Sequence, residues 1–188
     1  DPMDMTFDSN SNKIVIIYKH NADSDDGKAI VGTVSGTSIS FGTAVTWSTG
    51  NGDKSRCTFD SNSNKVVIVF KDTNNSSYTS SVVGTVSGTS ISFGSPVTFD
   101  SGGASFQGST FDSNANKVVT CYRDDGNSFY GTLVIGTVSG TSISFETEVV
   151  FNTGSTAYIA PTFDSNLNKV VIAYRDGGNS YYGTAVVF

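Results

Sequence analysis

The sequence predicts an all-β fold of tandem repeats, most simply a β-propeller whose blades are four-stranded antiparallel sheets. A unit of 52 residues recurs without insertion or deletion, and Thr-Phe-Asp marks its register at residues 6–8, 58–60, 110–112 and 162–164. A fixed period of this size is typical of repeat architectures. Apolar and alternating runs inside each unit are typical of strands, and no segment has helical periodicity. A linear array of stacked β units is the alternative architecture.

Each unit begins with a short strand that ends at Thr-Phe-Asp. The turn Asp-Ser-Asn-x-Asn-Lys then leads into an apolar run, such as residues 66–70 or 117–122, which suits a strand buried on both faces. A polar hairpin precedes the third strand, which we expect at residues 131–138 of the third unit. After a Ser-Gly turn, residues 38–41 and 45–47 alternate apolar and polar side chains, the period of an outer strand with one face in solvent.

One strand buried on both faces and one outer alternating strand are what a propeller blade requires. We expect a single repeat domain over residues 1–188, with units at approximately 5–56, 57–108, 109–160 and a partial 161–188. Because the last unit stops before its outer strand, we expect a fragment, a processed product or the ordered part of a longer chain. Closure of a ring would use an incomplete fourth blade, additional repeats, or a second copy in a homo-oligomer. Closure is favoured because open sheet edges promote aggregation.

Composition disfavours several classes of partner. Charged residues make up 15% of the chain, against roughly 25% in an average soluble domain, and the formal net charge is −6. This disfavours nucleic acid, whose phosphates require clustered Lys and Arg, and an anionic membrane surface. No run has the length of a transmembrane helix, so membrane insertion is not expected. Cys57 and Cys121 lack metal-ligand spacing, so we expect two unpaired thiols, at least one buried, and no cofactor.

Alternate oxygen-bearing side chains occur in the Asp-Ser-Asn-x-Asn-Lys turn, and such spacing can hold calcium. In the second unit the candidate ligands are Asp60, Asn62 and Asn64. However, Lys65 stands where an EF-hand loop requires glycine, and the acidic ligand that ends such a loop is missing. Asp and Asn also bond nearby backbone groups and tolerate left-handed conformations. We therefore expect a structural turn without a metal.

Overlaying the repeats separates fixed loops from variable ones. The turn after the first strand hardly changes, and Gly-Thr-Val-Ser-Gly-Thr-Ser-Ile-Ser-Phe is identical at 32–41, 84–93 and 136–145. The hairpin between the second and third strands varies, and so does the connection between units, at 51–57, 103–109 and 155–161. Loops alternate between the two ends of an antiparallel sheet, so the variable loops should share one end, here called the variable rim. Function in repeat proteins usually lies on the varied face.

The variable rim carries the residue types that bind sugars. Aromatic rings stack on apolar sugar faces, while amides and charged groups bond hydroxyls. The candidate ligand-binding residues are Arg123, Asp124, Asn127 and Tyr130 in one hairpin, Arg175, Asp176, Asn179 and Tyr182 in the next, and Phe106 and Tyr158 in the connections. The structural alternative is a hairpin with glycine at its tip, in which each Arg–Asp pair is local.

Catalysis is less favoured than binding. His20 is the single histidine, so a histidine-based triad is not expected. A glycosidase needs only carboxylates, but it needs an asymmetric pair of them, and most acidic residues here recur in every unit.

Residues 60–65 followed by Val-Val-Ile resemble the strand-connecting turn of kelch and YVTN-type propeller repeats, although the kelch double glycine and the WD dipeptide are missing. Over the whole chain, the repeats with Gly-Thr-Val-Ser-Gly-Thr-Ser-Ile-Ser-Phe resemble those of tail-fibre-like and surface proteins of marine phages and bacteria. This resemblance implies an exposed adhesive or structural role, extracellular, on a cell surface or on a virion. We therefore expect a non-enzymatic module that binds a glycan or cell-surface receptor. The alternatives are an assembly element of a fibre, filament or virion appendage and, less favoured, a carboxylate-dependent glycosidase.

Overall fold

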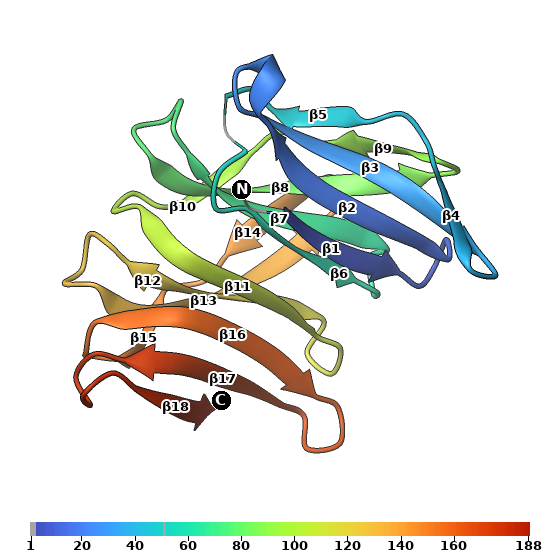
Figure 1. Ribbon diagram of the computed structural model, residues 1–188. Helices are drawn as coiled ribbons and strands as arrows, with labels where there is room; N and C mark the ends of the chain where they lie inside the picture. Colours follow the sequence, from blue (N-terminus) through green and yellow to red (C-terminus); the bar gives the residue numbers. More distant parts are fainter. Residues whose placement is uncertain (1–2, 51) are drawn as a thin grey trace.

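The computed structural model describes residues 3–50 and 52–188, and the fold is all-β, as predicted. Each repeat forms one antiparallel sheet (Figure 1), and the only helical element in the described residues is a short 3-10 turn, Asn21–Asp23.

The first sheet comprises β1 (Met3–Asp8), β2 (Lys13–His20), β3 (Asp26–Ser35), β4 (Ser38–Phe41) and β5 (Val45–Ser48). The second comprises β6 (Arg56–Asp60), β7 (Lys65–Asp72), β8 (Tyr78–Ser87), β9 (Ser90–Phe93) and β10 (Val97–Asp100). The third comprises β11 (Ala104–Asp112), β12 (Lys117–Asp124), β13 (Tyr130–Ser139), β14 (Ser142–Phe145) and β15 (Val149–Asn152). The fourth comprises β16 (Thr156–Asp164), β17 (Lys169–Asp176) and β18 (Tyr182–Val187).

The outer strand of each complete sheet is divided into two short segments, where the sequence suggested one strand. In the first sheet, β4 pairs with the second half of β3 and β5 pairs with its first half. Gly42 lies at the break, where a Cβ atom would clash with the carbonyl oxygen of Thr89 in the next sheet. Gly94 meets Thr141 in the same way one repeat later. The break therefore makes room for the Ser-Gly turn of the following sheet.

The four sheets pack against one another in chain order, with their first strands adjacent (Figure 1). β1 contacts β6, β6 contacts β11, and β11 contacts β16. In the second and third sheets the apolar run is buried on both faces, as predicted, whereas β2 and β17 bury one face. In β7, Ile68 and Phe70 pack against the first sheet, while Val67 packs with Val118 of the third. The core is therefore a series of layers between successive sheets.

Both cysteines are free and buried, in agreement with the sequence. Cys57 packs in the layer between the first and second sheets, and Cys121 in the layer between the third and fourth. Burial raises the pKa of both thiols. No helix of the described chain has the length and apolar character needed to cross a membrane.

Candidate ligand-binding site

Backbone hydrogen bonds join the variable hairpins to the variable connections at one end of the sheets. The Asp125 N–H donates to the Gly103 carbonyl at 2.9 Å, and the Gly177 N–H donates to the Ser155 carbonyl at 2.7 Å. The hairpin of one sheet and the connection that enters or leaves that sheet are thus held together. In the third and fourth sheets the variable hairpins and connections therefore lie at the same end, as the repeats predict.

A β-bulge places one aromatic residue of β11 and one of β16 at this rim. The pairing of β11 with β12 shifts between Ser105 and Gly108, so two residues of β11 face one residue of β12. Phe106 occupies the bulge with φ of 56°, and Tyr158 occupies the same place in β16 with φ of 53°. Left-handed backbone is uncommon for aromatic residues, and bulges re-aim side chains beside functional sites. The bulges therefore hold the backbone of both aromatic residues in a conformation that is uncommon for them.

Arg123 lies between two rings at the rim. Its guanidinium carbon is 4.9 Å from the ring centroid of Phe106 and 4.9 Å from that of Phe129. Such cation–π contacts stabilise an exposed site by about 0.5–1 kcal/mol each. Phe129 lies in the hairpin, again with positive φ, of 64°. Bulge and hairpin thus supply the two rings that hold one arginine.

The same arrangement recurs in the fourth sheet and contacts the arrangement of the third sheet. The guanidinium carbon of Arg175 is 4.8 Å from the Tyr158 centroid and 5.2 Å from the Tyr181 centroid. The rings of Phe106 and Tyr158 are 5.2 Å apart. The result is one continuous stack, here called the rim ladder, in the order Phe129, Arg123, Phe106, Tyr158, Arg175 and Tyr181. Tyr158 and Tyr181 remain 65% and 66% exposed, so much of this aromatic surface faces solvent.

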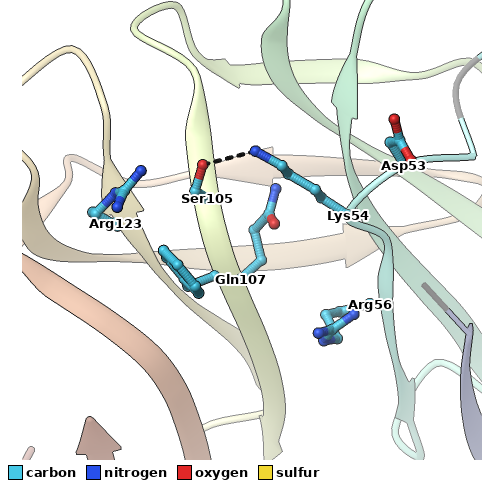
Figure 2. Close-up of a pocket in the computed structure, with 7 residues that line it drawn as sticks. Asp53, Lys54, Arg56, Ser105, Gln107 and Arg123 are labelled. Carbon is cyan, nitrogen blue, oxygen red and sulfur yellow. Dashed lines mark hydrogen bonds between the residues drawn. The ribbon is translucent and has the colours of Figure 1, made fainter. Parts of the chain in front are cut away.

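A pocket of about 400 Å³ lies beside the ladder, between the second and third sheets. The residues that line it are Asp53, Lys54, Arg56, Ser105, Phe106, Gln107 and Arg123 (Figure 2). All except Arg123 belong to the variable connections 51–57 and 103–109. This volume is at the lower end of the range for small-molecule sites, which is about 300–1,000 Å³.

Hydrogen bonds fix one wall of the pocket. The Lys54 Nζ donates to the Ser105 Oγ at 3.0 Å (Figure 2), and that hydroxyl donates to the Asp125 Oδ2 at 2.7 Å. The other carboxylate oxygen of Asp125 accepts from the Arg123 Nε at 2.7 Å. The chain from Lys54 to Arg123 spans two sheets. It holds two cationic side chains in place before any ligand arrives.

The two hairpin aspartates predicted as ligand-binding residues support the loops. The Asp124 Oδ1 accepts the Gly126 N–H at 2.9 Å, and the Asp176 Oδ1 accepts the Gly178 N–H at 2.8 Å. Asp124 is buried and Asp176 half-buried. Their position explains why an acidic residue stands there in three of the four repeats. Both aspartates therefore stabilise the conformation of the hairpins that form the rim.

The predicted asparagines and tyrosines of the hairpins lie at the loop tips and strand starts. Asn127 and Asn179 are exposed, and their carbonyl oxygens accept the N–H groups of Tyr130 and Tyr182 at 3.0 Å. Tyr130 and Tyr182 begin β13 and β18. The rings that enter the rim ladder belong to the preceding residues, Phe129 and Tyr181. Of the ten predicted residues, the structure brings Arg123, Phe106, Tyr158 and Arg175 into one stack.

Two carboxylates meet below the third-sheet hairpin. Gly102 separates Asp100 from Asp124, and a Cβ at this glycine would come within 3.2 Å of an oxygen of each. Burial raises the pKa of Asp124, and the charge of Asp100 adds to the effect. The two residues are only 7% and 6% exposed. They are therefore closed to a substrate at the surface.

The Asp-Ser-Asn-x-Asn-Lys turn has Asx-turn geometry. The Asp60 Oδ1 accepts the N–H groups of Asn62 and Ser63 at 2.9 and 3.0 Å, and its Oδ2 accepts the Ser63 hydroxyl at 2.6 Å. Asn64 follows with φ of 56°. Both carboxylate oxygens of the calcium candidate Asp60 thus bond within the turn. No cluster of three or more His, Cys, Asp or Glu suited to a metal forms among residues 3–50 and 52–188.

Sequence reasoning missed five residues of the pocket: Asp53, Lys54, Arg56, Ser105 and Gln107. Arg56 is replaced by Asp4, Gly108 and Ala160 in the other repeats, so no periodic signal marks it. The variability of the connection was the one available signal, and it pointed to the right segment without selecting the side chains.

The sequence matches no protein-family model and no curated protein. Exposed rings next to a pocket of cationic and amide side chains can stack on apolar faces and donate hydrogen bonds to oxygen atoms. Those are the two contacts that a sugar offers.

Proposed function

We propose that this protein is a non-enzymatic, extracellular glycan-binding module that recognises its ligand at the variable rim. The observation that carries the proposal is the rim ladder with its adjoining pocket. Rings held by bulges and stacked on arginines lose little conformational freedom on binding, which favours affinity. The ladder also presents polar and aromatic groups side by side, as sugars require.

The lining of the pocket supports binding rather than catalysis. A glycosidase needs two accessible carboxylates that flank the scissile bond. Asp53 is the only carboxylate among the lining residues. A pair of carboxylates near the hairpin, Asp100 and Asp124, is buried and bonded to loop backbone. These features favour recognition without turnover.

A glycan array probed with the labelled protein tests this proposal. We expect binding to a subset of glycans and at least a tenfold loss on Tyr158→Gly, which removes one exposed ring from the ladder. The matched control is Leu167→Gly, because Leu167 is 72% exposed in the Asp-Ser-Asn-x-Asn-Lys turn at the opposite end of the sheet. Absence of any glycan ligand for the unaltered protein would refute the proposal. Equal binding by the two variants would remove the ladder from the site.

We propose the β-propeller as the architecture that the four sheets build. In a propeller the sheets are arranged radially around a central channel, and adjacent first strands such as β1, β6, β11 and β16 suit its innermost positions. The linear array of stacked units remains the competing architecture. The two architectures differ in whether the outer faces of the first and fourth sheets are brought together to close a ring.

The second candidate function is assembly through these end faces. Phe7 on the first sheet is 50% exposed, whereas its equivalent Phe59 is 9% exposed because the first sheet covers it. At the other end Val187 is 60% exposed, whereas its equivalent Val83 is 1% exposed. The two end faces therefore correspond to the two sides of the interface already present between successive sheets. Two copies joined at both ends would form an eight-bladed ring, within the size range of propellers.

Sedimentation velocity over a range of concentrations tests the assembly candidate. We expect association that Phe7→Asp weakens and Leu167→Asp does not, because only the first change puts a charge into an end face. A dimer with a ring-shaped image in negative stain would support the propeller, and filaments would support the linear array. A monomer at every concentration would exclude self-assembly and would leave the glycan proposal intact.

A further inference from the structure

The pocket beside the rim ladder is cationic in a protein that is acidic overall. Lys54, Arg56 and Arg123 line it together with one carboxylate, Asp53. The whole chain carries 11 Lys and Arg against 17 Asp and Glu. Three basic side chains around one small cavity are therefore a local reversal of the net charge.

The carboxylates near the pocket leave part of this charge uncompensated. Asp125 bonds the Nε of Arg123, and Asp53 accepts from the Lys19 Nζ at 3.3 Å. Within the described residues neither Lys54 nor Arg56 forms an ion pair. The Arg56 Nη1 donates to the Ser55 carbonyl at 2.8 Å, which leaves its other donors available.

A buried amide adds a second, independent observation. Gln107 lines the pocket and is only 3% exposed, yet its Nε2 has no hydrogen-bond acceptor among residues 3–50 and 52–188. A buried donor without an acceptor is costly, and each such group in a native protein needs an explanation. Figure 2 shows Gln107 among the residues that line the pocket, with its side chain extending toward Lys54. An acceptor oxygen of a ligand at this place would satisfy the amide.

We propose that this pocket binds the ionised group of an acidic sugar, a carboxylate or a sulfate ester, while the sugar ring packs beside Phe106. The proposal rests on the glycan-binding function and specifies its ligand class. Arg56 and Lys54 supply the charge, and Gln107 donates a neutral hydrogen bond. Hydrogen bonds between arginine and an anionic oxygen are roughly twice as strong as neutral ones, so the acidic group dominates selection.

The test compares three panels on one glycan array: neutral, carboxylated and sulfated glycans. We expect hits in the acidic panels and a loss of tenfold or more on Arg56→Gln. The control Lys169→Gln removes the same charge from an exposed lysine at the opposite end of the fourth sheet, and we expect less than a twofold effect. Arg56→Lys keeps the charge and should retain most of the binding, which guards against a folding defect in Arg56→Gln.

The outcomes separate this inference from the function on which it rests. Hits in the carboxylated panel only, or in the sulfated panel only, support the proposal and identify the group. Hits confined to neutral glycans overturn the acidic-sugar inference and leave glycan binding intact. Equal losses on Arg56→Gln and Lys169→Gln also overturn it, because the attraction would then be nonspecific. An array without hits overturns both proposals.

Discussion

The rings of Phe106 and Tyr158, one repeat apart in the sequence, lie with their centroids 5.2 Å apart at the variable rim. Both occupy the bulge at the start of a first strand, and both have positive φ. Because first strands of successive sheets are adjacent, one repeated position places two rings in contact. The repeat thus converts a local backbone feature into a surface that spans two sheets.

We expect Tyr158→Gly to leave the stability of the fold nearly unchanged. Left-handed backbone costs a non-glycine residue on the order of 1–3 kcal/mol, and glycine removes that cost. The ring contributes contacts with Phe106 and Arg175 of about 0.5–1.5 kcal/mol each. The two effects oppose each other, so the free energy of unfolding in urea should change by less than about 1 kcal/mol.

The neighbouring Ile159→Ala provides the comparison. Ile159 is buried between the third and fourth sheets, and truncation of such a side chain costs about 2–5 kcal/mol. If Tyr158→Gly destabilised the protein as much as Ile159→Ala does, the ladder would be a structural element and its role in recognition would be weakened.

The Asp-Ser-Asn-x-Asn-Lys turns offer an internal comparison of side-chain anchoring. Asp60 receives three hydrogen bonds, including one from the Ser63 hydroxyl, whereas Asp112 receives two because Ala115 replaces the serine. Hydrogen bonds to a charged acceptor contribute about 1.5–3 kcal/mol each, and less than additively within one turn. Asp60→Ala should therefore lower the free energy of unfolding by about 3 kcal/mol, and Asp112→Ala by about 2 kcal/mol.

Ala115→Ser is the gain-of-contact counterpart. It should stabilise the third turn by about 0.5–1 kcal/mol, since it restores the missing hydroxyl. No gain would mean that the Ser63 hydroxyl contributes nothing. Added calcium should leave the Tm unchanged, because the carboxylate of Asp60 already bonds within its turn; a rise in Tm would show that the turns hold the ion.

The repeat explains why so much of the fold could be predicted. Alternation and apolar runs define strands, and a strand such as β7 is buried on both faces because both neighbouring sheets are copies of its own. The division of the outer strand was missed, although Gly42 and Gly94 mark it. These glycines show where the strand breaks, but the reason for the break is a contact with the next sheet, which the sequence of a single repeat does not show.

The site was predicted less completely, for reasons of backbone geometry. A prediction from alternation assumes that successive side chains of a strand point to opposite faces of the sheet. The bulge at Phe106 inserts an extra residue and breaks that alternation. In the hairpin, Ser128 and Phe129 both adopt positive φ, which brings Phe129 rather than Tyr130 to the ladder. Residue type identified the right loops. The choice between adjacent aromatic residues depends on dihedral angles that composition does not encode.

Both cysteines should be unreactive in the folded protein. Burial raises the pKa of Cys57 and of Cys121, so little thiolate forms near neutral pH, and reagents reach neither sulfur easily. We expect an aromatic disulfide reagent at pH 8 to label less than about one tenth of the thiols without denaturant and both thiols in urea. Fast labelling of one thiol under native conditions would show that the layer around it opens.

The Asp100–Asp124 pair predicts a specific dependence of stability on pH. The pKa of Asp124 is raised in the folded state, so the folded protein holds this proton more tightly than the unfolded chain. This group stabilises the fold fully at pH values below the ordinary aspartate pKa near 3.8, and the stabilisation is lost as pH rises through the higher pKa of the folded state.

In the fourth sheet the contact equivalent to the Asp100–Asp124 pair joins an amide to a carboxylate: the Asn152 Nδ2 donates to the Asp176 Oδ1 at 3.1 Å. Asp100→Asn copies that contact and should raise the Tm at pH 7 by roughly 3 °C, about 1 kcal/mol, with no gain at pH 3. The exposed Glu146→Gln, which changes the net charge equally, should show no such dependence on pH. A gain that is the same at pH 3 and pH 7 would mean that repulsion between the two carboxylates is not its cause.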